Sequence, residues 1–144
     1  MKLVVDASVA VKWFLPVSSR EQDADRATAL LHSVREGLVD LLQPPHWLAE
    51  VSAVITRLRP EIAAEAIDLL DAMEFDMVAD AELYKGASDL ATQLNQHLFD
   101  TLYHALALAN DALLVTADDR YLRKARALGR VVALAEWKPP ARVR

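Results

Sequence analysis

The stretch Lys2-Leu-Val-Val-Asp-Ala-Ser8 decides how the rest of the chain is interpreted. Three apolar residues, two of them β-branched, precede Asp6, and such a run is typical of a strand buried on both faces of a parallel sheet. Asp6 would then lie at the carboxyl end of that strand, where open α/β sheets bind their ligands. The remaining sequence must show whether other carboxylates reach the same edge.

Length and composition narrow the class of protein. The chain has 144 residues, which predicts one domain, and we place it at residues 1–138, with 139–144 as a mobile basic tail. There is no cysteine, which excludes a disulfide framework and a thiolate metal site. The sequence contains no signal peptide and no apolar run near the roughly 20 residues that cross a bilayer. We therefore expect a cytoplasmic protein without a membrane partner.

The charge is unevenly distributed along the chain. The net charge is -5, but residues 1–119 carry 20 acids and 8 bases, whereas residues 120–144 carry one acid and eight bases. A basic segment of this kind is either a surface for a nucleic-acid backbone or a solvated helix and tail. On charge alone the solvated surface is the simpler interpretation.

Short apolar runs alternate with amphipathic segments. The predicted strands cover 2–5, 39–43, 75–78, 112–116 and 131–134. The predicted helices cover 8–15, 27–38, 47–58, 61–73, 81–94, 98–110 and 119–128. We expect Ser8 to cap the first helix and residues 17–25 to form a loop that leads into the second. This alternation predicts an α/β fold with a mostly parallel sheet.

Four acids lie at strategic places in this pattern. Asp6 and Asp118 each follow a predicted strand, Asp100 opens the helix at 98–110, and Glu50 lies within the helix at 47–58. Each alone has a structural explanation: a helix cap, a favourable charge at a helix start, or, for Glu50, a surface ion pair with Arg57. Gathered at one edge, they would raise one another's pKa unless a cation neutralised them. Mg²⁺ and Mn²⁺ prefer such oxygen ligands.

Four segments around these acids resemble the motif blocks of PIN-domain proteins, and more narrowly of VapC-type toxins from bacterial and archaeal toxin–antitoxin pairs. The segments are Val4-Val-Asp6-Ala-Ser8, Pro45-His-Trp-Leu-Ala-Glu50-Val51, Phe99-Asp100-Thr-Leu-Tyr103-His-Ala-Leu-Ala107 and Leu114-Val-Thr116-Ala-Asp118-Asp119-Arg120. No single block is specific. The four occur in the family's order and span nearly the whole chain.

The resemblance implies a three-layer α/β/α fold and an endoribonuclease that depends on Mg²⁺ or Mn²⁺. It maps the catalytic, metal-binding carboxylates onto Asp6, Glu50, Asp100 and Asp118. It further implies a homodimer, and a cognate antitoxin whose C-terminal segment blocks the cleft.

The resemblance also suggests roles for neighbouring residues. Ser8 and Thr116 match the hydroxyl positions that support such a site. Asp119 is either a fifth acid or a residue in the first turn of the following helix.

The expected chemistry is in-line attack of an activated water on the scissile phosphate. Asp6, Asp100 and Asp118 would hold the metal, and Glu50 would bind a second ion or orient the water. The expected products carry a 5′-phosphate and a 3′-hydroxyl.

Other residues were considered for contact with the substrate or with the acids. Four bases are candidates for the RNA backbone: Lys12, Arg120, Arg123 and Lys124. For the last three the alternative is a solvated helix face. His46 and His104 share helix faces with Glu50 and Asp100, and for both we expect a structural role rather than general-base catalysis.

Two other functions were weighed against the nuclease. An aspartyl-nucleophile phosphatase needs a second aspartate two residues after Asp6, and Ser8 occupies that position. A receiver domain needs an acidic pair, but Ala7 follows Asp6. A PIN-fold binding or regulatory module without nuclease activity would not be expected to keep all four acids.

Overall fold

The computed structural model describes residues 1–15 and 21–142. The five strands within these residues are β1 (Lys2–Val5), β2 (Asp40–Gln43), β3 (Asp76–Met77), β4 (Leu113–Thr116) and β5 (Val131–Ala133). The helices there are α1 (Ala7–Ala10), α2 (Glu21–Arg35), α3 (Trp47–Leu58), α4 (Ala63–Asp71), α5 (Ala81–Leu94), α6 (Leu98–Ala109) and α7 (Asp119–Ala125). None of these helices is long and apolar enough to cross a membrane.

The strands form one parallel sheet in the order β3-β2-β1-β4-β5. Leu3 on the central strand pairs with Leu41 on one side and with Leu113 on the other. The chain therefore leaves β1 toward one edge of the sheet and later returns to β1's other side as β4. The carboxyl ends of β1 and β4 lie together at this change of direction, the position where open α/β sheets form their ligand crevice.

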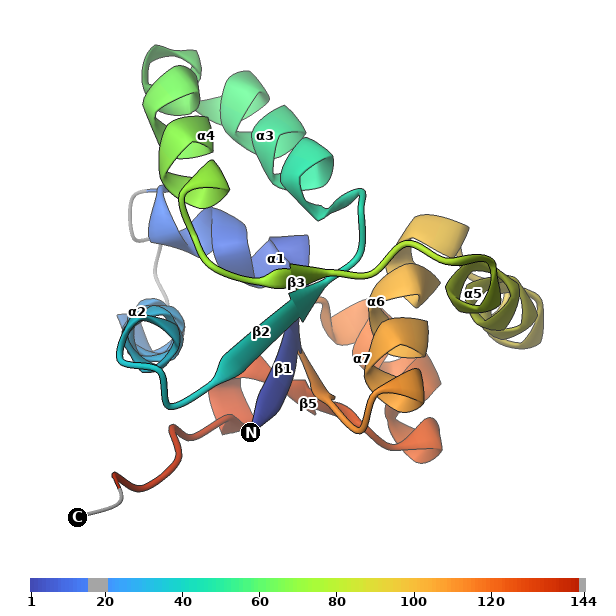
Figure 1. Cartoon of the computed structure of the whole chain (residues 1–144). Helices are drawn as coiled ribbons and strands as arrows, with labels where there is room; N and C mark the ends of the chain where they lie inside the picture. Colours follow the sequence, from blue (N-terminus) through green and yellow to red (C-terminus); the bar gives the residue numbers. More distant parts are fainter. Residues whose placement is uncertain (16–20, 143–144) are drawn as a thin grey trace.

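Helices cover both faces of the sheet (Figure 1). Leu3 and Val5 pack with Leu30 of α2 and with Trp137, whereas Val4 points to the opposite face and belongs to the larger core around α6. This alternation follows from the two-residue period of a strand, and it explains why the three consecutive residues Leu3, Val4 and Val5 are all apolar. The predicted three-layer α/β/α fold is confirmed.

Three details of the predicted elements are wrong. Ser8 does not cap the first helix: Asp6 is the N-cap of α1, because the helix begins directly after the strand. The predicted loop at residues 17–25 is helical from Glu21 onward, while residues 17–20 lie outside the described part. The predicted helix at 61–73 divides into a 3₁₀ turn at Pro60–Ile62, followed by α4.

Two more 3₁₀ turns alter the ends of predicted elements. Arg126–Leu128 forms one directly after α7, and Leu134–Glu136 forms another where the last strand was expected to continue. A further 3₁₀ turn, Val11–Trp13, follows α1. Such turns are frequent at helix ends because they satisfy backbone groups within a shorter repeat.

The buried side chain of Gln43 extends the sheet beyond its backbone pairing. Its amide nitrogen donates to the Val5 carbonyl at 3.0 Å, and the Val5 N–H donates to its amide oxygen at 3.2 Å. The Gln43 side chain is fully buried. It therefore takes the place of a neighbouring strand for Val5, the residue that directly precedes Asp6.

We expect the substitution Gln43→Leu to lower the free energy of unfolding by about 2 kcal/mol or more, because it leaves two buried backbone groups of Val5 without partners. Urea denaturation measures this change. The control Gln93→Leu, at an exposed position of α5, should stay within about 0.5 kcal/mol of the parent. Equal stability of the two variants would show that the Gln43 bonds carry no net stabilisation.

Candidate active site

The carboxylate of Asp6 is held at the end of β1 by hydroxyl groups from two elements. Its Oδ2 accepts from the hydroxyl and the backbone N–H of Ser8, and from the hydroxyl of Thr116 at 3.2 Å. Burial raises the pKa of Asp6, and the charge of Asp100 acts in the same direction, while the bonds from Ser8 and Thr116 oppose the shift. The carboxylate is therefore fixed in place in surroundings that disfavour its charge.

The two hydroxyl residues also fix the chain around Asp118. Ser8 Oγ accepts from the Ala117 N–H at 3.0 Å, and Thr116 Oγ1 accepts from the Asp118 N–H at 3.0 Å. Asp118 caps α7, because its Oδ1 accepts from the Tyr121 N–H at 3.0 Å. Its second carboxylate oxygen has no such bond. Ser8 and Thr116 thus connect the ends of β1 and β4, and Thr116 links the Asp6 carboxylate to the backbone of Asp118.

Asp119 has a different position from Asp118. It is the first residue of α7 and its side chain is exposed. A negative charge in a first turn is favoured by the helix dipole. Of the two roles considered for Asp119, its location matches the first-turn residue.

Glu50 reaches the same edge from the first turn of α3. Its Oε2 accepts from the Tyr103 hydroxyl at 2.7 Å. Burial raises the pKa of Glu50 to about 7; the charges of Asp6 and Asp100 add to this effect, and the Tyr103 bond opposes it. No ion pair joins Glu50 to Arg57 among the described residues. Tyr103 lies within one of the four motif segments, but nothing in the sequence indicated this bond.

Asp100 lies in the first turn of α6. Its Oδ2 accepts from the side-chain amide of Gln96 at 2.9 Å. No sequence signal pointed to Gln96, because a glutamine between two helices is ordinary surface composition. The structure therefore adds Gln96 to the residues around the acids.

The two histidines near the acids occupy structural positions. His46 bonds through Nε2 to the Phe99 carbonyl at 2.8 Å, and burial lowers its pKa. His104 is fully buried, with its Nε2 at 2.8 Å from the Gly129 carbonyl and its Nδ1 at 2.9 Å from the Tyr121 hydroxyl. Since a carbonyl can only accept, Nε2 carries the proton and the Tyr121 hydroxyl donates to Nδ1. His104 thereby ties α6 to α7.

Three of the acids, Asp6, Glu50 and Asp100, are close enough for charge on one to affect another, and Asp118 acts on the neighbouring Tyr121 hydroxyl. Asp6 and Asp100 both raise the pKa of Glu50, and the charges of Asp6, Asp100 and Asp118 all act on the Tyr121 hydroxyl. Within residues 1–15 and 21–142, however, no three carboxylate or histidine groups lie close enough to hold a metal ion as they stand. By donor type and by charge the acids fit a hard divalent cation, because its charge would offset the burial and the smaller mutual repulsion that raise the pKa values of Asp6 and Glu50.

The four basic candidates separate into two groups. Arg120 and Lys124 line a polar hollow of about 410 Å³ together with Asn95, Gln96 and His97. Arg123 is exposed on α7, and Lys12 is half-buried in the turn after α1; neither lines this hollow.

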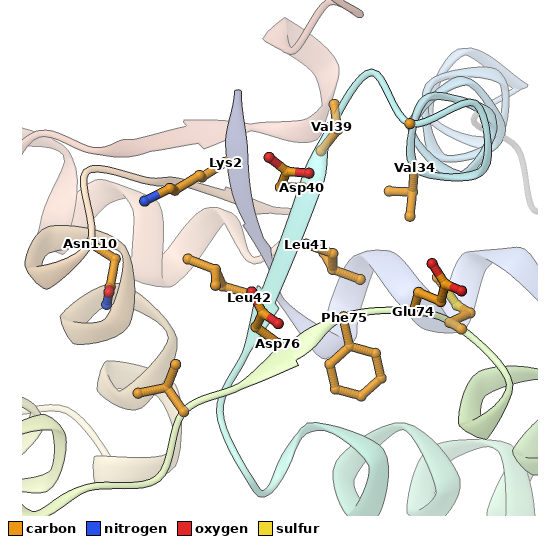
Figure 2. A pocket seen from close by; sticks show the side chains of 13 residues that line it. Lys2, Val34, Val39, Asp40, Leu41, Leu42, Glu74, Phe75, Asp76 and Asn110 are labelled. Carbon is orange, nitrogen blue, oxygen red and sulfur yellow. The ribbon is translucent and has the colours of Figure 1, made fainter.

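A separate hollow of about 760 Å³ lies beside β2 and β3. Figure 2 shows Lys2, Asp40 and Asp76 around it, near the amino-terminal starts of β1, β2 and β3. None of the four acids lines it. The hollow is therefore distinct from the carboxyl edge where the acids gather.

Comparison with known proteins places these features in context. The model of the PIN domain family matches residues 3–127. A search of curated proteins finds no match.

Several solved structures share the fold. VapBC2 from Rickettsia felis, bound to a DNA fragment from its promoter, aligns with a TM-score of 0.64 and 16% identity over 92% of this chain and 97% of that chain. VapBC-1 from nontypeable Haemophilus influenzae aligns with a TM-score of 0.63 and 17% identity, over 94% of this chain and 100% of that chain. DNA-bound VapBC from Salmonella typhimurium aligns with a TM-score of 0.63 and 13% identity, over 93% of this chain and 98% of that chain. At these identities the similarity concerns the fold.

We expect Glu50→Gln to change the pH dependence of stability in the metal-free protein. The pKa of Glu50 is raised from 4.5 to about 7 in the folded chain, so its contribution to stability is fully present below pH 4.5 and is lost as pH rises through about 7. The variant should therefore gain stability relative to the parent between pH 5 and pH 8.

Thermal unfolding in the presence of a chelator at both pH values measures this gain. Glu65→Gln, at an exposed position of α4, is the matched control and should show no such gain. A constant difference between Glu50→Gln and the parent at the two pH values would contradict the raised pKa.

Proposed function

The chain belongs to the PIN domain family, and from this premise we propose that it is a metal-dependent endoribonuclease that acts as the toxin of a type II toxin–antitoxin pair. The observation that carries the proposal is the gathering of Asp6, Glu50, Asp100 and Asp118 around the junction of β1 and β4. Two of these acids have raised pKa values in the metal-free chain. Such a cluster destabilises the metal-free fold, which argues for a function that needs the charges.

In this proposal Asp6, Asp100 and Asp118 would hold Mg²⁺ or Mn²⁺. A divalent cation bound there would supply a water of lowered pKa and would stabilise charge on the phosphate. The hydroxyls of Ser8 and Thr116 keep Asp6 in one orientation, so this ligand is already positioned. The other acids would have to move closer to it for the site to be filled.

The remaining acid would act on the attacking water. Glu50 is fixed by the Tyr103 hydroxyl and would orient that water toward the phosphate. One carboxylate oxygen of Asp118 caps α7, and the other has no hydrogen bond to a described residue. His46 Nε2 lies 3.7 Å from Glu50 Oε2, but we assign neither histidine a part in the chemistry, because both are bonded to backbone carbonyls.

The proposed partners are RNA as substrate, a cognate antitoxin and a second copy of the chain. Support for the antitoxin comes from solved structures of the same fold, since the matched proteins from Rickettsia felis, Haemophilus influenzae and Salmonella typhimurium are VapBC complexes. The homodimer is proposed from the family resemblance. Arrest of bacterial growth on expression of the chain, and its relief by the antitoxin, would support the biological role.

One observation favours a second candidate, a PIN-fold binding module without nuclease activity. No three potential ligands in the described residues are close enough to hold a metal ion as placed. The two functions differ in a direct assay, because a binding module would retain RNA without cutting it in the presence of Mg²⁺ or Mn²⁺.

We expect the purified protein to cleave single-stranded RNA with Mg²⁺ or Mn²⁺ and to lose this activity with a chelator. Asp6→Asn should lower the cleavage rate by at least about a hundredfold, because the amide removes a negatively charged ligand oxygen. Gel electrophoresis of an end-labelled RNA measures the rate and identifies the product ends.

The matched control is Asp89→Asn, at an exposed position of α5, which should cleave at the parental rate. Circular dichroism should show that both variants are folded. Unchanged cleavage by Asp6→Asn, or by the parent after chelation, would refute the proposed chemistry.

A further inference from the structure

A polar hollow lies beside the acids, where the connection between α5 and α6 faces α7. Its volume is about 410 Å³, and its lining consists of Asn95, Gln96, His97, Arg120 and Lys124. Two of these residues carry a full positive charge and none is acidic. The hollow is therefore an electropositive space next to an electronegative site.

Arg120 and Lys124 are presented to the hollow by the geometry of α7. They are four residues apart, which places them on the same face of the helix. Both side chains are exposed. Among the described residues no carboxylate forms an ion pair with either of them. Their charges are thus available to an anion from solution.

The ammonium group of Lys124 is held in place by the wall of the hollow. It donates to the Asn95 carbonyl at 3.0 Å and to the side-chain oxygen of Gln96 at 3.0 Å. An ammonium group has three donors, so one remains for a ligand. Arg120 has no hydrogen bond to another described residue, which leaves its planar guanidinium free for the paired bonds that suit phosphate oxygens.

Gln96 joins the hollow to the acids. Its amide oxygen accepts from Lys124, and its amide nitrogen donates to Asp100 Oδ2 at 2.9 Å. Arg120 is also only two residues beyond Asp118. Gln96 therefore links the lining of the hollow directly to Asp100, one of the proposed metal-binding acids.

We propose that this hollow binds a phosphate group of the RNA strand next to the phosphate that is cleaved, with Arg120 and Lys124 as its ligands. The proposal rests on the proposed function for the identity of the ligand, a single-stranded RNA. It deepens that function by distinguishing the basic residues: Arg120 and Lys124 line the hollow, whereas Arg123 on the same helix does not. Contacts of this kind position the strand without reading its sequence.

The test compares Arg120→Ala and Lys124→Ala with Arg123→Ala, which removes the same charge from the same helix outside the hollow. All three are made in the Asp6→Asn background without divalent ions, so that the RNA stays intact. Fluorescence anisotropy with a labelled single-stranded RNA of ten nucleotides measures the dissociation constant at several salt concentrations.

We expect Arg120→Ala and Lys124→Ala to weaken binding about tenfold and to reduce the slope of log affinity against log salt by about 0.7, the value for one phosphate contact on a single strand. Arg123→Ala should change the affinity less than about twofold. Equal weakening by the three variants would show diffuse attraction and would overturn the proposal. So would no weakening by Arg120→Ala and Lys124→Ala, or no measurable RNA binding by the Asp6→Asn parent.

Failure of this proposal is distinguishable from failure of the proposed nuclease. If the Asp6-containing protein cleaves RNA with Mg²⁺ but the three alanine variants bind RNA alike, the nuclease stands and the phosphate site does not. If the protein cuts no RNA with Mg²⁺ or Mn²⁺, while Arg120→Ala and Lys124→Ala alone weaken binding, the phosphate site stands and the nuclease does not.

Discussion

The structure around the site depends on keeping the carboxylate of Asp6 buried at the end of the central strand. Burial of a charge is costly unless hydrogen bonds compensate for lost water. Ser8 and Thr116 supply those bonds, and both also bind backbone N–H groups at the start of the segment that leads into α7. The same hydrogen bonds that offset the cost of burying the Asp6 carboxylate thus fix the ends of β1 and β4 against each other.

Helix α6 connects this junction to the other parts of the site. Tyr103 lies three residues and His104 four residues after Asp100, so both are neighbours of Asp100 on the surface of the helix. Tyr103 binds Glu50 of α3, and His104 binds the hydroxyl of Tyr121 on α7. Tyr103, His104 and Tyr121 are buried, so the two bonds hold three helices in a defined arrangement around the acids.

Charges of opposite sign are separated across a short distance. The acids gather where the strands end, and the basic residues of α7 follow directly in the sequence after Asp118 and Asp119. Gln96 lies between the two regions and bonds to both Asp100 and Lys124. A substrate with a phosphate backbone can meet both regions at once, provided that a cation neutralises the acids.

The sequence alone determined the five strands, their parallel arrangement and the edge to which Asp6 and Asp118 belong, because strand length, apolar runs and helix periodicity record local burial. It did not predict the bonds of Gln43, Tyr103 or Gln96, nor which of the two candidates, Asp6 and Ser8, caps α1, nor which basic residues line the hollow. The first two of these residues bind partners 38 and 53 positions away. Such bonds depend on how packed helices and strands orient individual side chains, and only the tertiary structure decides that, because periodicity reveals a residue's face but not its partner.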